Sequence, residues 1–196
     1  MAKILTSRNS TKKDAIIQQA ALLFKTKSYT SASMRELAIS LGVEAPSLYN
    51  HIGSKSELLQ EICFKVGNKF TEQIEMIEAS RALVIGKVEA IIRFHIKIML
   101  ENFNEVYVAN HEWKHLKEPF LSDFLNIRRN YEKSLTTLIE KGIELNELKS
   151  TNPYVAVLTI LSAVRGLEFW QRNKKNVSQQ VLEDDMVNHL INGIVN

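Results

Sequence analysis

The stretch SMRELAISLGVEAPSLYNHIGSKSELL, residues 33–59, contains two short helix patterns separated by a turn. The first pattern begins with Ser33 and Glu36 in capping-box spacing, in which a hydroxyl and a carboxylate satisfy free amides at a helix start. Gly42 supplies the backbone freedom of a tight turn, and Pro46 suits the first turn of the second helix, where its missing N–H costs little. The stretch therefore predicts a helix, a turn and a second helix over residues 45–52.

A long fourth helix follows directly. Gly53 ends the second pattern, and Ser54 and Glu57 repeat the capping-box spacing. Its apolar positions recur at helical spacing and are Leu58, Leu59, Ile62, Val66, Phe70 and Ile74. N-terminal to residues 33–59, the stretch that decides the fold, we predict a polar arm over residues 1–13 and a first helix over residues 14–27. The apolar face of this helix comprises Ile16, Ile17, Ala20, Ala21 and Phe24.

The rest of the chain also reads as helices. Residues 83–103 and 120–142 each carry one apolar stripe, which predicts helices that face a core. Residues 154–170 are apolar nearly all round, so this helix must be covered on more than one side. Only one more amphipathic helix follows, with Val187, Leu190, Ile191 and Ile194. We therefore expect a partner subunit to cover the remaining apolar surface of residues 154–170. We expect a homodimer built on these last two helices.

Composition supports an all-α fold. The chain has 196 residues with 45% hydrophobic content, but only 7 Gly and 3 Pro, too few turn residues for a many-stranded sandwich or barrel. We predict a three-helix helix-turn-helix domain over residues 1–56 and a helical ligand-binding and dimerisation domain over residues 57–196. The sequence shows no signal-peptide pattern and no membrane span, and its lone Cys63 forms no internal disulfide, so we expect a cytoplasmic protein.

Positive charge is concentrated at the front of the chain. Residues 1–66 hold nine Lys and Arg against five Asp and Glu, whereas the remainder holds sixteen against seventeen. A basic N-terminal segment on an otherwise neutral chain is what neutralisation of DNA phosphates requires, although a few lysines also make an ordinary solvated face. The charge distribution favours a nucleic-acid partner.

The deciding stretch resembles the tetracycline-repressor (TetR) family of transcription factors. The matching elements are Ala38 in the first of the two helices, the turn Leu41-Gly42-Val43, the pair Leu48-Tyr49, and Ser54-Lys55 before Glu57-Leu58-Leu59. Residues 43–51 look like the recognition helix of that family. The resemblance implies a dimeric repressor that binds a palindromic double-stranded DNA operator. Its two recognition helices would lie roughly 34 Å apart, and binding of a small molecule would release the repressor from the DNA.

The resemblance and the chemistry of the side chains assign base-reading residues. At its family-equivalent position, Arg35 would make a bidentate contact to guanine. Ala45, Pro46 and Ser47 would offer apolar and hydroxyl contacts to the major groove.

Other side chains in the same stretch suit the DNA backbone. Tyr49, His51 and Lys55 are expected to bind phosphates, and Asn50 to read adenine or to hydrogen-bond the backbone. The alternative for each is an ordinary exposed helix residue. Core positions that hold the two helices at their angle are expected at Leu37, Ala38, Val43 and Leu48.

In the TetR family the C-terminal domain is a ligand sensor. His95 lies on an apolar stripe with Met99 and Phe103, and is the best candidate for a polar group in an effector pocket. Further candidates to line it are Tyr107, Trp113, Phe120, Phe124, Arg128, Tyr131 and Trp170. The alternative is that these side chains simply fill the core.

A finer resemblance concerns the effector. Residues 128–132, Gly142, and Gly166 with Trp170 are similar to family members that respond to acyl-CoA thioesters, which implies an acyl-CoA-like effector. Lys174 departs from that pattern, because it stands where a second tryptophan is expected.

The run His111-Glu112-Trp113-Lys114-His115 spells the H-E-x-x-H pattern of zinc proteases. No third ligand follows it in a placed helix, and the sequence has neither a phosphate-cradling glycine loop nor a nucleophile elbow. We therefore expect no enzyme, cofactor or metal. A zinc-dependent hydrolase using His111, Glu112 and His115 stays as the alternative, as does a helical binding protein whose helix-turn-helix has lost its target. A sensor-type metal site that uses His111 or His115 also stays open.

Overall fold

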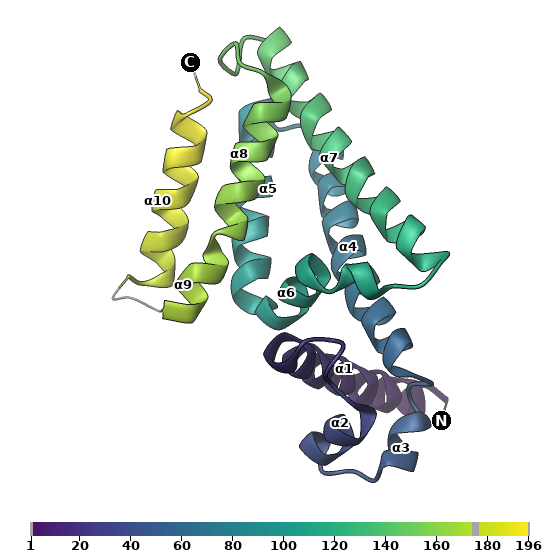
Figure 1. Cartoon of the computed structure of the whole chain (residues 1–196). Coiled ribbons are helices and arrows are strands. Elements are labelled where there is room, and N and C mark those ends of the chain that lie inside the picture. The colour runs from purple at the N-terminus through teal and green to yellow at the C-terminus, as the bar shows by residue number, and fades with distance from the viewer. Residues whose placement is uncertain (1, 174–176, 196) are drawn as a thin grey trace. The chain divides into compact units, whose positions relative to one another are not determined.

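The computed structural model describes residues 2–173 and 177–195, and every regular element in them is a helix. The helices are α1 (Ala2–Lys27), α2 (Met34–Leu41), α3 (Ala45–Tyr49), α4 (Lys55–Ala79), α5 (Val84–Glu101), α6 (Phe103–His111), the 3₁₀ turn η1 (Trp113–His115), α7 (Phe120–Glu144), α8 (Pro153–Arg165), α9 (Leu167–Asn173) and α10 (Gln179–Asn192) (Figure 1). One isolated antiparallel bridge pairs Leu148 with Val195. The prediction of an all-α fold is confirmed, and none of the described helices is long and apolar enough to span a membrane.

The helices form two compact units. The first unit contains Met1–Gly67 and Asn104–Leu125, and the second contains Asn68–Phe103 and Asn126–Asn196. Helices α4 and α7 therefore contribute residues to both units. The first unit includes α6 in addition to the helices predicted for residues 1–56; a domain boundary after residue 56 stays a prediction.

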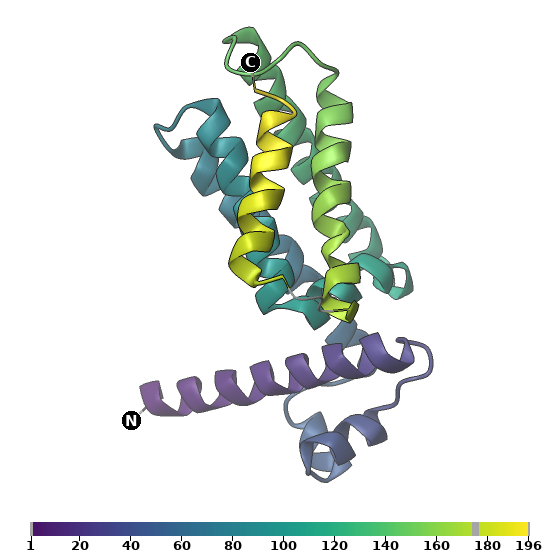
Figure 2. The same ribbon diagram turned by 90° about the vertical axis from the view of Figure 1, so that its left-hand side faces the viewer.

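In the first unit, α2 packs against both α1 and α3. Figure 2 shows α1 as one long rod. Its predicted apolar face is buried, from Ile16 to Phe24, as are Leu37, Ala38 and Leu48. Val43, predicted in the core, is 42% exposed. The prediction was wrong because the Val43 amide closes the end of α2 by donating to the Ala38 carbonyl at 3.0 Å, and Ile52 is the buried residue instead.

Helix ends differ from prediction in several places. The predicted polar arm is part of α1, and α3 stops at Tyr49 because the amides of His51 and Ile52 both donate to the Leu48 carbonyl in a turn. Helix α6 was not predicted. The apolar helix expected over residues 154–170 is divided at Gly166, a poor helix former, into α8 and α9. Lys174 lies outside the described residues.

The second unit is organised around α5, which packs against α8, α9 and α10 (Figure 1). Its buried stripe includes Val88, Ile92, Ile96 and Met99, as predicted. Arg93 of the same helix reaches the carboxylates of α10, with its guanidinium 3.1 Å from Glu183 and 3.5 Å from Asp184. This ion-pair group and the burial of Val187 fix α10 against α5.

Candidate nucleic-acid interface and buried polar site

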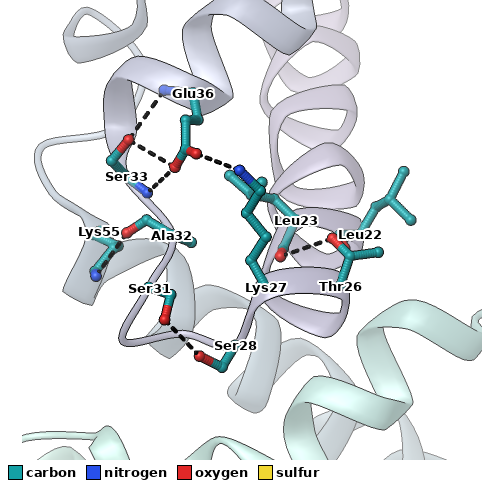
Figure 3. Close-up of polar contacts among 10 residues, drawn as sticks. All are labelled: Leu22, Leu23, Thr26, Lys27, Ser28, Ser31, Ala32, Ser33, Glu36 and Lys55. Atoms are coloured by element: carbon teal, nitrogen blue, oxygen red, sulfur yellow. Dashed lines mark hydrogen bonds and ion pairs between the residues drawn. The ribbon is translucent and has the colours of Figure 1, made fainter.

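The start of α2 is fixed by a complete capping box (Figure 3). The Ser33 hydroxyl accepts the Glu36 amide at 3.2 Å, and the Glu36 carboxylate accepts the Ser33 amide at 3.0 Å. The ammonium of Lys27, in the last turn of α1, donates to the same carboxylate and is the main reason that the pKa of Glu36 falls to about 2. The end of α1 and the start of α2 are therefore joined through one side chain.

The turn between α2 and α3 has the geometry that the sequence predicts. Gly42 adopts the left-handed conformation at φ 67°, and Pro46 stands in the first turn of α3. Only Leu48 of α3 is buried, at 1% exposure, while Pro46, Ser47 and Tyr49 are exposed. One leucine thus anchors a short helix whose remaining surface faces solvent.

Most of the predicted DNA-contacting residues share this exposure. Arg35 at the start of α2 and Asn50 after α3 are exposed, and Ala45 and His51 are half-buried. Two exposed apolar residues were missed by sequence reasoning, namely Ile39, 70% exposed, and Val43. The spacing of Ile39, one helical turn after Arg35, could have placed it on the same outward face of α2.

Lys55 is engaged inside the first unit. Its ammonium donates to the carbonyls of Tyr29 and Ala32 at 2.9 Å each and of Thr30 at 3.3 Å, and lies 4.5 Å from the centre of the Tyr29 ring. Figure 3 shows the bond to Ala32. An ammonium has three N–H donors, so all of them have an acceptor. Lys55 therefore holds the loop between α1 and α2, and we do not retain it among the phosphate ligands.

The second unit contains a polar pair made of a buried histidine and a half-buried tyrosine. His95 of α5 is 8% exposed, and its Nε2 lies 2.6 Å from the hydroxyl of Tyr131 of α7. The ring of Phe70, from α4, lies 4.5 Å from the His95 ring and 5.8 Å from the Tyr131 ring. The sequence had placed His95 and Tyr131 in one site, and the structure brings them together; Phe70 was missed as their neighbour.

Burial decides the protonation of this pair. Desolvation, with a smaller contribution from the positive charge of Arg165, lowers the pKa of His95 to about 3. Burial also raises the pKa of Tyr131 above its ordinary value. Both side chains are therefore neutral near pH 7, and each can serve as donor or acceptor of a hydrogen bond.

Two protein-family matches bear on this architecture. Residues 84–194 match the family described as "Tetracyclin repressor-like, C-terminal domain", and residues 16–62 match "Bacterial regulatory proteins, tetR family". The chain belongs to the TetR family. A curated relative, the HTH-type transcriptional repressor KstR2 of Mycolicibacterium smegmatis, is 20% identical over 144 residues, which cover 73% of this chain and 70% of the relative.

Solved structures share the fold of this TetR-family regulator. The ketosteroid transcriptional regulator KstR2 of Mycobacterium tuberculosis superposes with a TM-score of 0.87 at 17% identity, covering 94% of this chain and 95% of the other. The structure of AibR in complex with isovaleryl coenzyme A and operator DNA gives a TM-score of 0.79 at 23% identity, covering 91% and 97%. As a member of the TetR family, this chain is a DNA-binding transcriptional regulator rather than an enzyme.

The H-E-x-x-H run of the regulator serves aromatic packing. Helix α6 ends at His111, so the two histidines do not stand one turn apart on an α-helix. The His111 ring lies 4.3 Å from that of Tyr107, and the His115 ring stacks 5.3 Å from that of Tyr29. Within the described part of the chain, no three His, Cys, Asp or Glu side chains are placed to share a metal ion.

The other pocket candidates of the regulator divide between the two units. Met99, Phe103, Arg128 and Trp170 belong to the second unit with His95 and Tyr131, and the indole N–H of Trp170 is buried without a hydrogen-bond partner among the described residues. The candidates in the first unit are Tyr107, Trp113, Phe120 and Phe124. Of these, Phe120 and Phe124 pack on Phe64, with ring centres 6.2 and 5.9 Å apart respectively.

The buried histidine predicts acid sensitivity. Its folded pKa of about 3 lies below the ordinary value of 6.5, so the unfolded chain binds the proton first. The stability contributed by neutral His95 is complete above about pH 6.5 and is lost as the pH falls towards 3. Between pH 7 and 5 this amounts to about 2 kcal/mol. Urea unfolding of the parent and of His95→Gln at both pH values measures it; equal losses in the two proteins would refute the assignment.

Proposed function

We propose that this regulator is a cytoplasmic homodimeric repressor, which binds a palindromic operator through α2 and α3 and is released by an acyl-CoA-type effector. The observation that carries the proposal is the short helix α3, anchored by Leu48 alone and preceded by the left-handed Gly42 turn, with its remaining face exposed. A helix held in this way is able to enter a major groove without disturbing the core beneath it.

The exposed face gives each DNA contact a chemical basis. Arg35 reads guanine through its guanidinium, while Ala45, Pro46 and Ser47 contact the base edges on the floor of the major groove. Ile39 is one turn from Arg35 and offers an apolar surface for a thymine methyl group.

Backbone contacts come from the residues that end α3. Tyr49 and His51 donate to phosphates, and Asn50 reads adenine or donates to the backbone. Lys55 stabilises the loop that precedes α2 and makes no phosphate contact in this proposal.

The dimer forms through the outward face of α8 and α9. This face carries Val155 and Leu158, each about half exposed, and Phe169, 71% exposed, with Ser162 and Gly166 exposed between them. Large apolar side chains in such a row favour a protein interface. The exposed positions of α10 are mostly polar, and Val181 is its apolar contribution.

The effector class is supported by the second unit and by one relative. AibR, whose fold this chain shares, was solved with isovaleryl coenzyme A. The interior of the second unit combines apolar helices with the neutral pair His95 and Tyr131, which suits the acyl end of such a ligand, an apolar chain with one polar carbonyl group. The remaining proposed lining residues in this unit are Met99, Phe103, Arg128 and Trp170.

Replacement of Arg35 by alanine tests the DNA-binding face. Loss of one bidentate guanine contact from each subunit is expected to weaken binding to the operator by about 100-fold, while binding to random duplex DNA changes little. Fluorescence anisotropy with the intergenic DNA beside the regulator's own gene measures both.

Arg81→Ala is the matched control, because it removes the same charge from an exposed position between α4 and α5. If both variants lose affinity equally for operator and random DNA, Arg35 acts only as a charge and the base-reading role fails. Addition of isovaleryl-CoA to the parent complex tests release in the same cuvette.

A further inference from the structure

The His95–Tyr131 pair stands out in the interior of the second unit. Among the described residues of that unit, His95 is the one polar or charged residue that is buried. The other buried residues there are apolar, and two of them, Ile91 and Ile92, precede His95 by about one helical turn. A polar pair in such surroundings determines which ligand groups the interior accepts.

A small apolar cavity lies in the second unit, lined by residues about one helical turn from each member of the pair along α5 and α7. Ile91 and Ile92 of α5, together with Leu135, one turn beyond Tyr131 on α7, line it. Its other walls are Val88, Leu138, Ile139, Val157 and Ile160, and its volume is about 10 Å³. An apolar space of this size stays dry and has no room for a branched chain until the helices move apart.

The hydrogen-bond inventory of the pair leaves one donor unused. A neutral imidazole has one N–H and a tyrosine has one O–H, and the 2.6 Å bond between them uses one of these. The described residues give neither ring another hydrogen-bond partner. The remaining donor suits a neutral acceptor, whereas a carboxylate here would have no compensating charge within the pair.

We propose that the pair binds the carbonyl oxygen of an acyl thioester through the Tyr131 hydroxyl, which accepts the Nε2–H of His95, and that the acyl chain occupies the cavity lined by α5, α7 and α8. This inference rests on the proposed effector class. It makes the pair a selector for the thioester, which has a neutral carbonyl, over the corresponding thioether, which has none.

The test compares two ligands that differ only in the carbonyl group. Calorimetric titration of the full chain with isovaleryl-CoA and with its thioether analogue S-(3-methylbutyl)-CoA is expected to show about tenfold tighter binding of the thioester. Tyr131→Phe removes the hydroxyl and is expected to abolish the tenfold preference. Thr136→Val, which removes a hydroxyl that only bonds a carbonyl of α7 itself, is expected to retain it.

The outcomes separate this inference from the proposed function. Equal affinity of the parent for both ligands overturns carbonyl recognition and leaves the acyl-CoA effector standing. Binding of neither ligand overturns the effector class and the inference with it. A preference that persists in Tyr131→Phe excludes Tyr131. Should that variant unfold by circular dichroism, His95→Gln decides instead, because it is expected to reduce the preference and an unchanged preference would exclude the pair.

Discussion

Leu158→Glu is expected to convert the regulator from a dimer into a monomer and to lower its operator affinity by at least about 100-fold. Leu158 lies in the middle of the exposed apolar face of α8 and is 49% exposed in the single chain. In a two-fold interface the substitution places a carboxylate on both sides, where burial without a partner is costly. A monomer then reaches only one half-site, and the contacts of the second recognition helix are lost.

The same exposure makes Leu158→Glu a clean test. A side chain that faces solvent in the protomer tolerates a charge without unfolding it, which far-UV circular dichroism checks. Light scattering during size-exclusion chromatography measures mass, and anisotropy measures operator binding. Thr137→Glu is the matched control, since it adds the same charge at an exposed position of α7 and is expected to leave the dimer intact. A Leu158→Glu protein that remains dimeric rules out the α8 face as the interface.

Features that depend on a few neighbouring residues were predictable from the sequence. The capping box of Ser33 and Glu36, the left-handed Gly42 and the buried Leu48 all follow from signals within one or two helical turns. The second predicted capping box, Ser54 with Glu57, is only partly formed. The Ser54 hydroxyl accepts the Glu57 amide at 3.1 Å, but the Glu57 carboxylate accepts the amide of Gly53, at 2.8 Å, in place of the amide of Ser54. A shift of one residue in a cap is below the resolution of a spacing pattern.

Features that depend on distant residues were not predictable. Phe70 and His95 are brought into ring contact by two different helices, and no spacing rule connects them. The Lys55 ammonium finds carbonyls more than twenty positions earlier in the chain, so its sequence context, a basic residue at a helix start, indicated a phosphate ligand instead. Where a flexible cation ends up depends on which acceptors the fold brings within its reach.

Lys55→Ala is therefore expected to destabilise the first unit by about 3 kcal/mol, because three carbonyls of the α1–α2 loop lose charged hydrogen bonds and Tyr29 loses a cation–π contact. Urea unfolding monitored by hydrogen exchange in residues 28–33 measures the loss at the loop itself. Lys65→Ala is the matched control: its ammonium pairs with the exposed Asp14, and its loss is expected to cost less than about 1 kcal/mol.

The same two variants distinguish a structural lysine from a phosphate ligand. A lysine that neutralises a phosphate lowers the slope of log affinity against log salt by about 1 when it is removed. Because every N–H of Lys55 already has a carbonyl acceptor within the first unit, we expect the slope for random duplex DNA to be unchanged in Lys55→Ala while the stability falls. A reduced slope with unchanged stability would mean that the ammonium leaves the loop when DNA binds, and would return Lys55 to the phosphate contacts.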